Sequence, residues 1–174
     1  MLRSRHHLCL RLTLVSGLLA PLGLSQHSPS SEAATVDALA REAQTALGRE
    51  DWPTAVRGYE KLVKLVPGRA DFHLNLGVAR YSSGKASDAV APLRQALKLK
   101  PDLITAQDYL AVSLAESSQC REALARLKKS AGRVSDPQLK RAVGLNGIRC
   151  SMGTGQPQEA VDFIRRLTRD FPHD

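Results

Sequence analysis

The chain has 174 residues, of which 43% are hydrophobic and only 4% aromatic, so any core must be built mainly from aliphatic side chains. Alanine and leucine dominate and runs of β-branched residues are scarce, which favours helices over a sheet. The net charge of +8 falls to +5 without the first 25 residues, and an excess this mild is typical of a solvated surface rather than of a nucleic-acid-binding protein.

Residues 1–25 have the order of a secretory signal. A basic start precedes an apolar run over residues 12–24, and the small residues Gly23 and Ser25 stand where cleavage after Ser25 requires them. The alternative is an uncleaved membrane anchor, but the run has 13 residues and contains Pro21, whereas a spanning helix needs about 20. We therefore expect an exported chain, periplasmic or extracellular, with residues 26–33 as a flexible lead. It would meet a membrane only through an uncleaved signal.

A repeated pattern follows from about residue 34. Ala55, Ala89 and Ala123 are each 34 residues apart, and Ala160 comes 37 residues later, which indicates a three-residue insertion before the last helix. Apolar residues three and four positions apart follow each alanine and form one stripe along a helix. Gly77, in the preceding helix of its unit, would let two helices approach closely.

Residues typical of turns and helix ends separate these stripes. Gly84 and Gly155 lie between the two helices of their units, and Asp136 followed by Pro137 is typical of a helix start. The sequence predicts eight helices, at residues 34–48, 52–65, 70–83, 86–99, 104–117, 120–132, 138–153 and 157–170.

This pattern resembles that of the tetratricopeptide-repeat (TPR) family, most closely over residues 73–101 and least in the last unit. The resemblance implies an all-α fold, a right-handed superhelical solenoid of about four helix–turn–helix units within residues 34–172. The expected units are at about 36–69, 70–103, 104–137 and 138–172.

The resemblance also implies a concave groove that binds a peptide or a segment of a protein partner. The positions that face ligands in the family give these candidate groove residues: Asp71, Leu74, Val78, Tyr81, Asp108, Val112, Ala115 and Arg149. The groove positions hold none of the lysines and asparagines of a carboxylate clamp, so we do not expect it to bind a C-terminal carboxylate. Its apolar centre suits docking by side-chain burial.

Two cysteines, Cys120 and Cys150, remain once the signal with Cys9 is removed. In the fold that the resemblance implies, Cys120 begins one helix and Cys150 lies late in the next, antiparallel helix, so the thiols would come close together. A disulfide and two unpaired, buried cysteines are both compatible with this placement.

The sequence contains no metal-ligand spacing, no phosphate-binding glycine loop and no nucleophile motif. We therefore expect no enzymatic activity, metal, cofactor or small-molecule substrate, and a scaffold for a protein or peptide partner is the leading interpretation. The last helix exposes an apolar stripe with nothing to cover it, at Val161, Ile164, Leu167 and Phe171. A homodimer through this helix would cover it. The chain would alternatively be a regulatory or targeting segment of a longer protein or enzyme whose C-terminal part is missing. Nucleic-acid binding through basic helix faces is the alternative that the sequence favours least.

Overall fold

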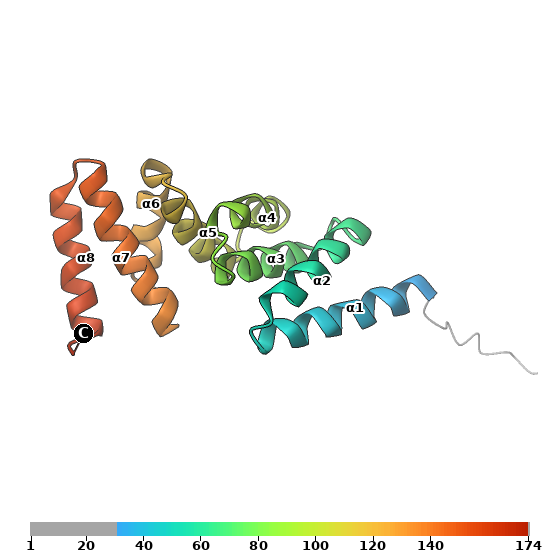
Figure 1. The fold of residues 1–174 in the computed structure, drawn as a ribbon. Coiled ribbons are helices and arrows are strands. Elements are labelled where there is room, and N and C mark those ends of the chain that lie inside the picture. Colours follow the sequence, from blue (N-terminus) through green and yellow to red (C-terminus); the bar gives the residue numbers. More distant parts are fainter. Residues whose placement is uncertain (1–30, 174) are drawn as a thin grey trace, which may run out of the picture.

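The computed structural model describes residues 31–173, which form eight α-helices stacked side by side into a superhelical solenoid (Figure 1). The helices are α1 (Ser31–Gly48), α2 (Trp52–Leu65), α3 (Ala70–Ser82), α4 (Ala86–Leu99), α5 (Ile104–Glu116), α6 (Cys120–Ser130), α7 (Pro137–Gly153) and α8 (Pro157–Asp170). The predicted all-α fold is confirmed, because every predicted helix is present and the described residues contain no strand.

The first helix begins earlier than predicted. Residues 31–33, which we expected in the flexible lead, are helical, because Glu32 and Ala33 are good helix formers. The predicted signal and the rest of the lead lie outside the described residues. Within the described part of the chain, no helix is both long and apolar enough to cross a membrane.

The same turn joins the two helices of every pair. In each turn a backbone N–H donates to the carbonyl five residues earlier: Asp51 to Ala46, Lys85 to Arg80, Gln119 to Leu114, and Gln156 to Ser151. The residue before each donor is left-handed: Glu50 (φ 60°), Gly84 (φ 78°), Ser118 (φ 64°) and Gly155 (φ 72°). This is the Schellman geometry that satisfies the last carbonyls of a helix. It fixes the angle at which each chain reversal occurs.

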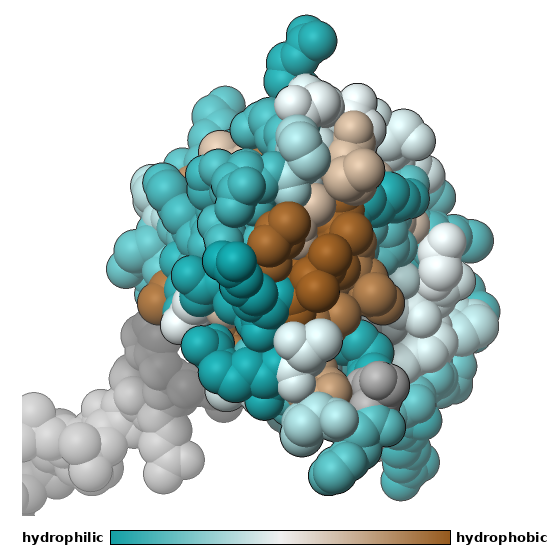
Figure 2. Space-filling view, turned by 90° about the vertical axis from the view of Figure 1, so that its left-hand side faces the viewer, coloured by the Kyte–Doolittle hydropathy of each residue, from teal (hydrophilic) through white to brown (hydrophobic). Residues whose placement is uncertain are grey.

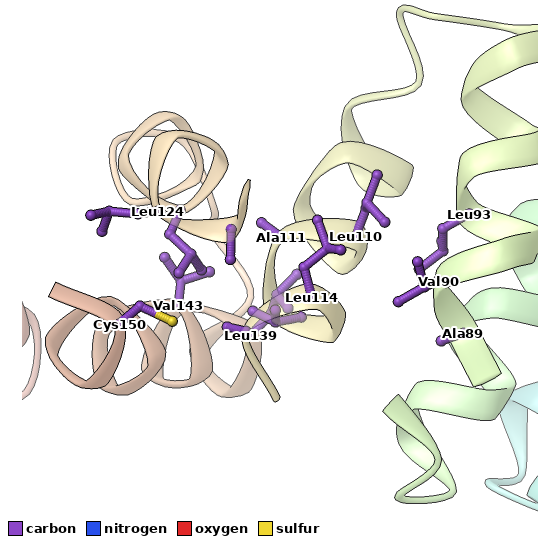
Figure 3. Close-up of a cluster of buried hydrophobic side chains, with 14 of the residues drawn as sticks. Ala89, Val90, Leu93, Leu110, Ala111, Leu114, Leu124, Leu139, Val143 and Cys150 are labelled. Carbon is purple, nitrogen blue, oxygen red and sulfur yellow. The ribbon is translucent and has the colours of Figure 1, made fainter. Parts of the chain in front are cut away.

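Repeat alanines and glycines allow the helices to pack closely. Ala55, Ala89 and Ala123 are fully buried, and a Cβ added at Gly77 would stand 2.5 Å from Leu93 Cγ. One cluster of buried side chains joins α1, α2 and α3, and a larger one joins α4 to α8 (Figure 3). Apolar burial is thus continuous from each helix to the next.

The extra length of the last unit lies in α7, which has 17 residues, four more than the 13 of α3 and α5. As predicted, Asp136 caps this helix: its carboxylate accepts the N–H of Leu139 at 2.7 Å, and Pro137 follows it. The longer helix packs against α8 at two glycines, and a Cβ at Gly147 would collide with the ring of Phe163.

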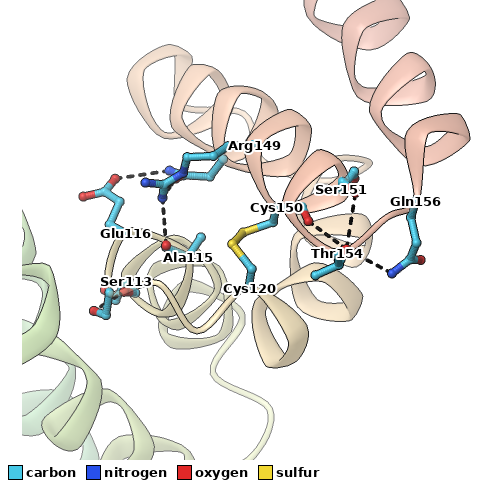
Figure 4. The surroundings of a disulfide bond; sticks show 11 residues. Ser113, Ala115, Glu116, Cys120, Arg149, Cys150, Ser151, Thr154 and Gln156 are labelled. Atoms are coloured by element: carbon cyan, nitrogen blue, oxygen red, sulfur yellow. Dashed lines mark hydrogen bonds between the residues drawn. A yellow bond between two sulfur atoms is a disulfide. The ribbon is translucent and has the colours of Figure 1, made fainter.

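Cys120 and Cys150 form a disulfide in the structure, with an S–S distance of 2.06 Å and a Cα–Cα distance of 4.9 Å (Figure 4). Cys120 is the first residue of α6, and Cys150 lies near the end of α7. The side chain of Cys150 is fully buried. The bond therefore links the third helical pair to the fourth.

The left-handed turn residues give a first prediction. An alanine in this conformation costs about 1–2 kcal/mol, so Gly84→Ala should lower the free energy of unfolding by about 1 kcal/mol, and Ser118→Gly should raise it by up to about 1 kcal/mol. Urea unfolding followed by circular dichroism measures both. Gly68→Ala is the matched control, because Gly68 has an ordinary φ and open space around its Cα. Equal destabilisation by Gly84→Ala and Gly68→Ala would contradict the assignment.

A second prediction concerns the disulfide in solution. In a chain carrying Cys9→Ser, maleimide should label no cysteine of the denatured, unreduced protein and two after reduction. The bond spans 30 residues, so reduction should lower the free energy of unfolding by about 3 kcal/mol. The Cys120→Ser/Cys150→Ser variant should not respond to reductant. Two reactive thiols before reduction would refute the bond.

Candidate functional site

A pocket of about 590 Å³ opens on the side of the stack formed by the first helices of the pairs. It lies between the end of α3, the middle of α5 and the start of α7, and the α1–α2 turn closes one side. Its lining includes three aromatic residues, Trp52, Tyr81 and Tyr109, and three acidic ones, Glu50, Glu116 and Asp136.

The two tyrosines form the wall of the pocket. Their ring centroids are 5.5 Å apart in an edge-to-face arrangement, which is the favourable geometry for an aromatic pair. The Oη of Tyr81 donates to Glu116 Oε1 at 2.8 Å, which ties α3 to α5. Burial, followed by the neighbouring Glu116, raises the pKa of Tyr81, and burial and Asp136 raise that of Tyr109. Both phenols therefore stay neutral near pH 7.

A hydrogen-bond network extends the wall to α7 (Figure 4). Asn146 Nδ2 donates to Glu116 Oε1 at 3.2 Å. Arg149 Nη2 donates to the carbonyl of Ala115 at 2.7 Å and to Asn146 Oδ1 at 2.6 Å. Three successive first helices are thus held together beside the pocket.

The pocket is acidic. Its lining contains three carboxylates and no lysine or arginine. Asp136 is partly occupied in capping α7, and Glu116 is held by Tyr81 and Asn146 through one oxygen. Uncompensated carboxylates beside aromatic faces favour a positively charged group.

The predicted groove residues fall into separate places. Val78 and Tyr81 line the pocket, and Arg149 lies beside it, committed to bonds between α5 and α7. Leu74 instead packs against the larger core cluster. Asp71 is exposed away from the pocket and pairs with Arg69 at 2.6 Å.

The other three predicted groove residues are not on the surface. Val112 and Ala115 are 0% exposed and Asp108 is 4% exposed, because α5 contacts both α3 and α7 and these neighbours close over it. Asp108 accepts hydrogen bonds from Ser130 at 2.5 Å and from Arg133 at 2.7 Å, so it faces the second helices. We expected Asp108, Val112 and Ala115 to line the groove, but their side chains are buried between helices.

Several pocket residues were absent from the candidate set. Trp52 begins a second helix, and Glu50 lies in a turn, so reasoning from the first helices alone passed over both. Tyr109 follows Asp108, which was predicted to line the groove. Its large aromatic side chain, like that of the single tryptophan in the sequence, could have indicated a binding surface.

The end of the stack formed by α7 and α8 carries a second surface feature. Figure 2 shows apolar side chains gathered at the centre of this face. Val161 and Ile164 are 37% and 44% exposed, whereas Val90 and Leu93, at the same register in α4, are 6% and 0% exposed. Covering of this face by a second copy stays a prediction.

The tetratricopeptide-repeat family model matches residues 40–104, the part of the chain that contains α2, α3, α4 and the second half of α1. No curated protein matches the chain in sequence. Recognition by sequence is thus limited to the first half of the described helices.

Solved structures extend the likeness to most of the chain. YrrB, described as a TPR protein with an unusual peptide-binding site, is 19% identical with a TM-score of 0.65, and the match covers 83% of this chain and 72% of YrrB. MamA is 17% identical with a TM-score of 0.65, covering 79% and 74%. The Sgt2 TPR domain from Aspergillus fumigatus is 17% identical with a TM-score of 0.58, covering 74% and 88%. At these identities the likeness establishes the fold: residues 40–104 match the tetratricopeptide-repeat family, and the helices that follow them continue the same repeat architecture.

Proposed function

We propose that the chain is a non-catalytic scaffold that holds a peptide segment of a protein partner in the pocket lined by Trp52, Tyr81 and Tyr109. The observation that carries this proposal is a pocket of about 590 Å³ with aromatic walls and an entirely acidic set of charges. Apolar and aromatic surface supplies binding energy, and a few fixed polar groups supply specificity.

The chemistry of the lining specifies the peptide. A lysine or arginine side chain can place its charge beside Glu50 and Glu116 while its aliphatic stem lies on an aromatic face. An apolar neighbour in the peptide would contact Val78 and Leu139, which also line the pocket. The preferred segment is therefore a basic residue next to an apolar one.

The hydrogen-bond network beside the pocket supports binding without rearrangement. Tyr81 and Asn146 both donate to Oε1 of Glu116, so hydrogen bonds from α3 and α7 hold this side chain in place. A wall that is ordered before binding loses little conformational entropy when the peptide arrives. This suits a scaffold that presents one fixed surface, and YrrB, a TPR protein described as having an unusual peptide-binding site, offers a precedent in the same fold.

We also propose that the chain works after export, in an oxidising compartment. The Cys120–Cys150 disulfide supports this, because structural disulfides persist outside the reducing cytosol. The basic and apolar N-terminal sequence supports it independently. The bond would hold the third and fourth pairs in register in such a compartment.

The third prediction tests the pocket with a random peptide library displayed on phage. Selected peptides should contain a lysine or arginine beside an apolar residue. Their affinity, measured by fluorescence anisotropy, should fall roughly 30-fold, or about 2 kcal/mol, in Trp52→Ala. Glu50→Lys should weaken them similarly, because it reverses a charge at the pocket.

Asp102→Lys is the matched control, because Asp102 is exposed, has no ion pair within the described residues and lies outside the pocket. It makes the same change in net charge as Glu50→Lys. Selection of peptides without a basic residue, or equal affinity in all three variants, would refute the proposed site.

A further inference from the structure

A second pocket lies on the other set of helices. It has a volume of about 690 Å³ and is formed by α4, α6 and the loop that follows α6, with part of α5 at its base. Five cationic side chains line it: Arg94, Lys98, Arg126, Lys129 and Arg133. We propose that this basic pocket binds an acidic peptide segment, independently of the pocket formed by the first helices.

The positive charge of the basic pocket is only partly compensated. Glu122 is the one acidic residue in its lining, and it pairs with Arg94 at 2.7 Å and with Arg126 at 3.5 Å. Arg133 pairs with the buried Asp108 at 2.7 Å. Within the described residues, neither Lys98 nor Lys129 has an ion-pair or hydrogen-bond partner. Two ammonium groups therefore line the pocket without a neutralising partner in the described part of the chain.

The cations are arranged as two rows. Arg94 and Lys98 are one turn apart on α4, and Arg126 and Lys129 are one turn apart on α6, so each row follows one helix face. An extended chain lying between the helices would pass both rows. Carboxylates spaced along that chain can pair with each row in turn, and arginine offers them a two-pronged hydrogen bond.

The base of the basic pocket selects a peptide over a nucleic acid. Leu97, Leu110 and Ala125 line it alongside the cations, and no aromatic residue does. Single-stranded nucleic acids obtain much of their affinity by stacking bases on aromatic rings, and that contribution has no platform here. Aliphatic side chains of an acidic peptide, by contrast, can bury themselves on this base.

The two pockets share no lining residue and carry opposite charges. Different ligand chemistries would therefore occupy the two sides of one stack. If no acidic peptide binds the basic pocket, binding of a basic peptide beside Trp52 is unaffected, because that binding is measured with other peptides and other variants.

A fluorescein-labelled peptide in which aspartate and glutamate residues alternate with single leucines tests the proposal. Fluorescence anisotropy with the full chain should show saturable binding that weakens as salt is added. The Lys98→Glu/Lys129→Glu variant should lose roughly tenfold or more in affinity, about 1.4 kcal/mol. Circular dichroism should be unchanged, because both lysines are exposed.

The control is Lys61→Glu/Lys64→Glu, which makes the same charge change on the exposed face of α2, outside the basic pocket. This control should keep nearly full affinity for the peptide. An equal loss of affinity in both double variants would overturn the proposal, because binding would then depend on net charge alone. So would absence of saturable binding, or displacement of the peptide by inorganic phosphate or by a single-stranded oligonucleotide at equal charge concentration. If Lys98→Glu/Lys129→Glu fails to fold, the milder Lys98→Gln/Lys129→Gln should show a smaller loss in the same direction, and no loss there would overturn the proposal.

Discussion

The apolar face that a pair of helices cannot bury by itself is the constraint on which the whole structure depends. Ala89 and Leu93 of α4 are fully buried because α5 packs against them. At the same register in α8, Ile164 is 44% exposed because no described helix follows it. Stability therefore arises between neighbouring pairs rather than within one of them. The disulfide between α6 and α7 reinforces one of these interfaces with a covalent bond.

Packing of this kind determines which side chains stay at the surface. The first helices approach one another closely enough to bury Val112 and Ala115, and the larger side chains around them, Tyr81, Tyr109 and Glu116, are left to form the pocket. The second helices α4 and α6 leave the basic pocket between them. One repeated packing scheme thus produces two surfaces with opposite charge.

The sequence predicted the fold more accurately than the site. Helix positions are predicted from the spacing of many apolar residues, so one atypical residue does not change the prediction. Groove positions, by contrast, were single residues taken from the family resemblance. Unit four departs from the others because α7 has 17 residues instead of 13. The contacts of α5 with α3 and α7 bury Val112 and Ala115, which the family pattern placed in the groove.

By itself, the sequence determined the eight helices, the left-handed turn at Gly84, the cap at Asp136 and the chain positions of the two cysteines. These features depend on residues close together along the chain, so local preferences suffice to specify them. Only the tertiary structure decided that Asp108 turns toward Arg133, that Trp52 joins Tyr81 and Tyr109, and that Lys98 faces the same pocket as Lys129. These arrangements depend on the distance between stacked helices, which is set by the size of every side chain packed between them.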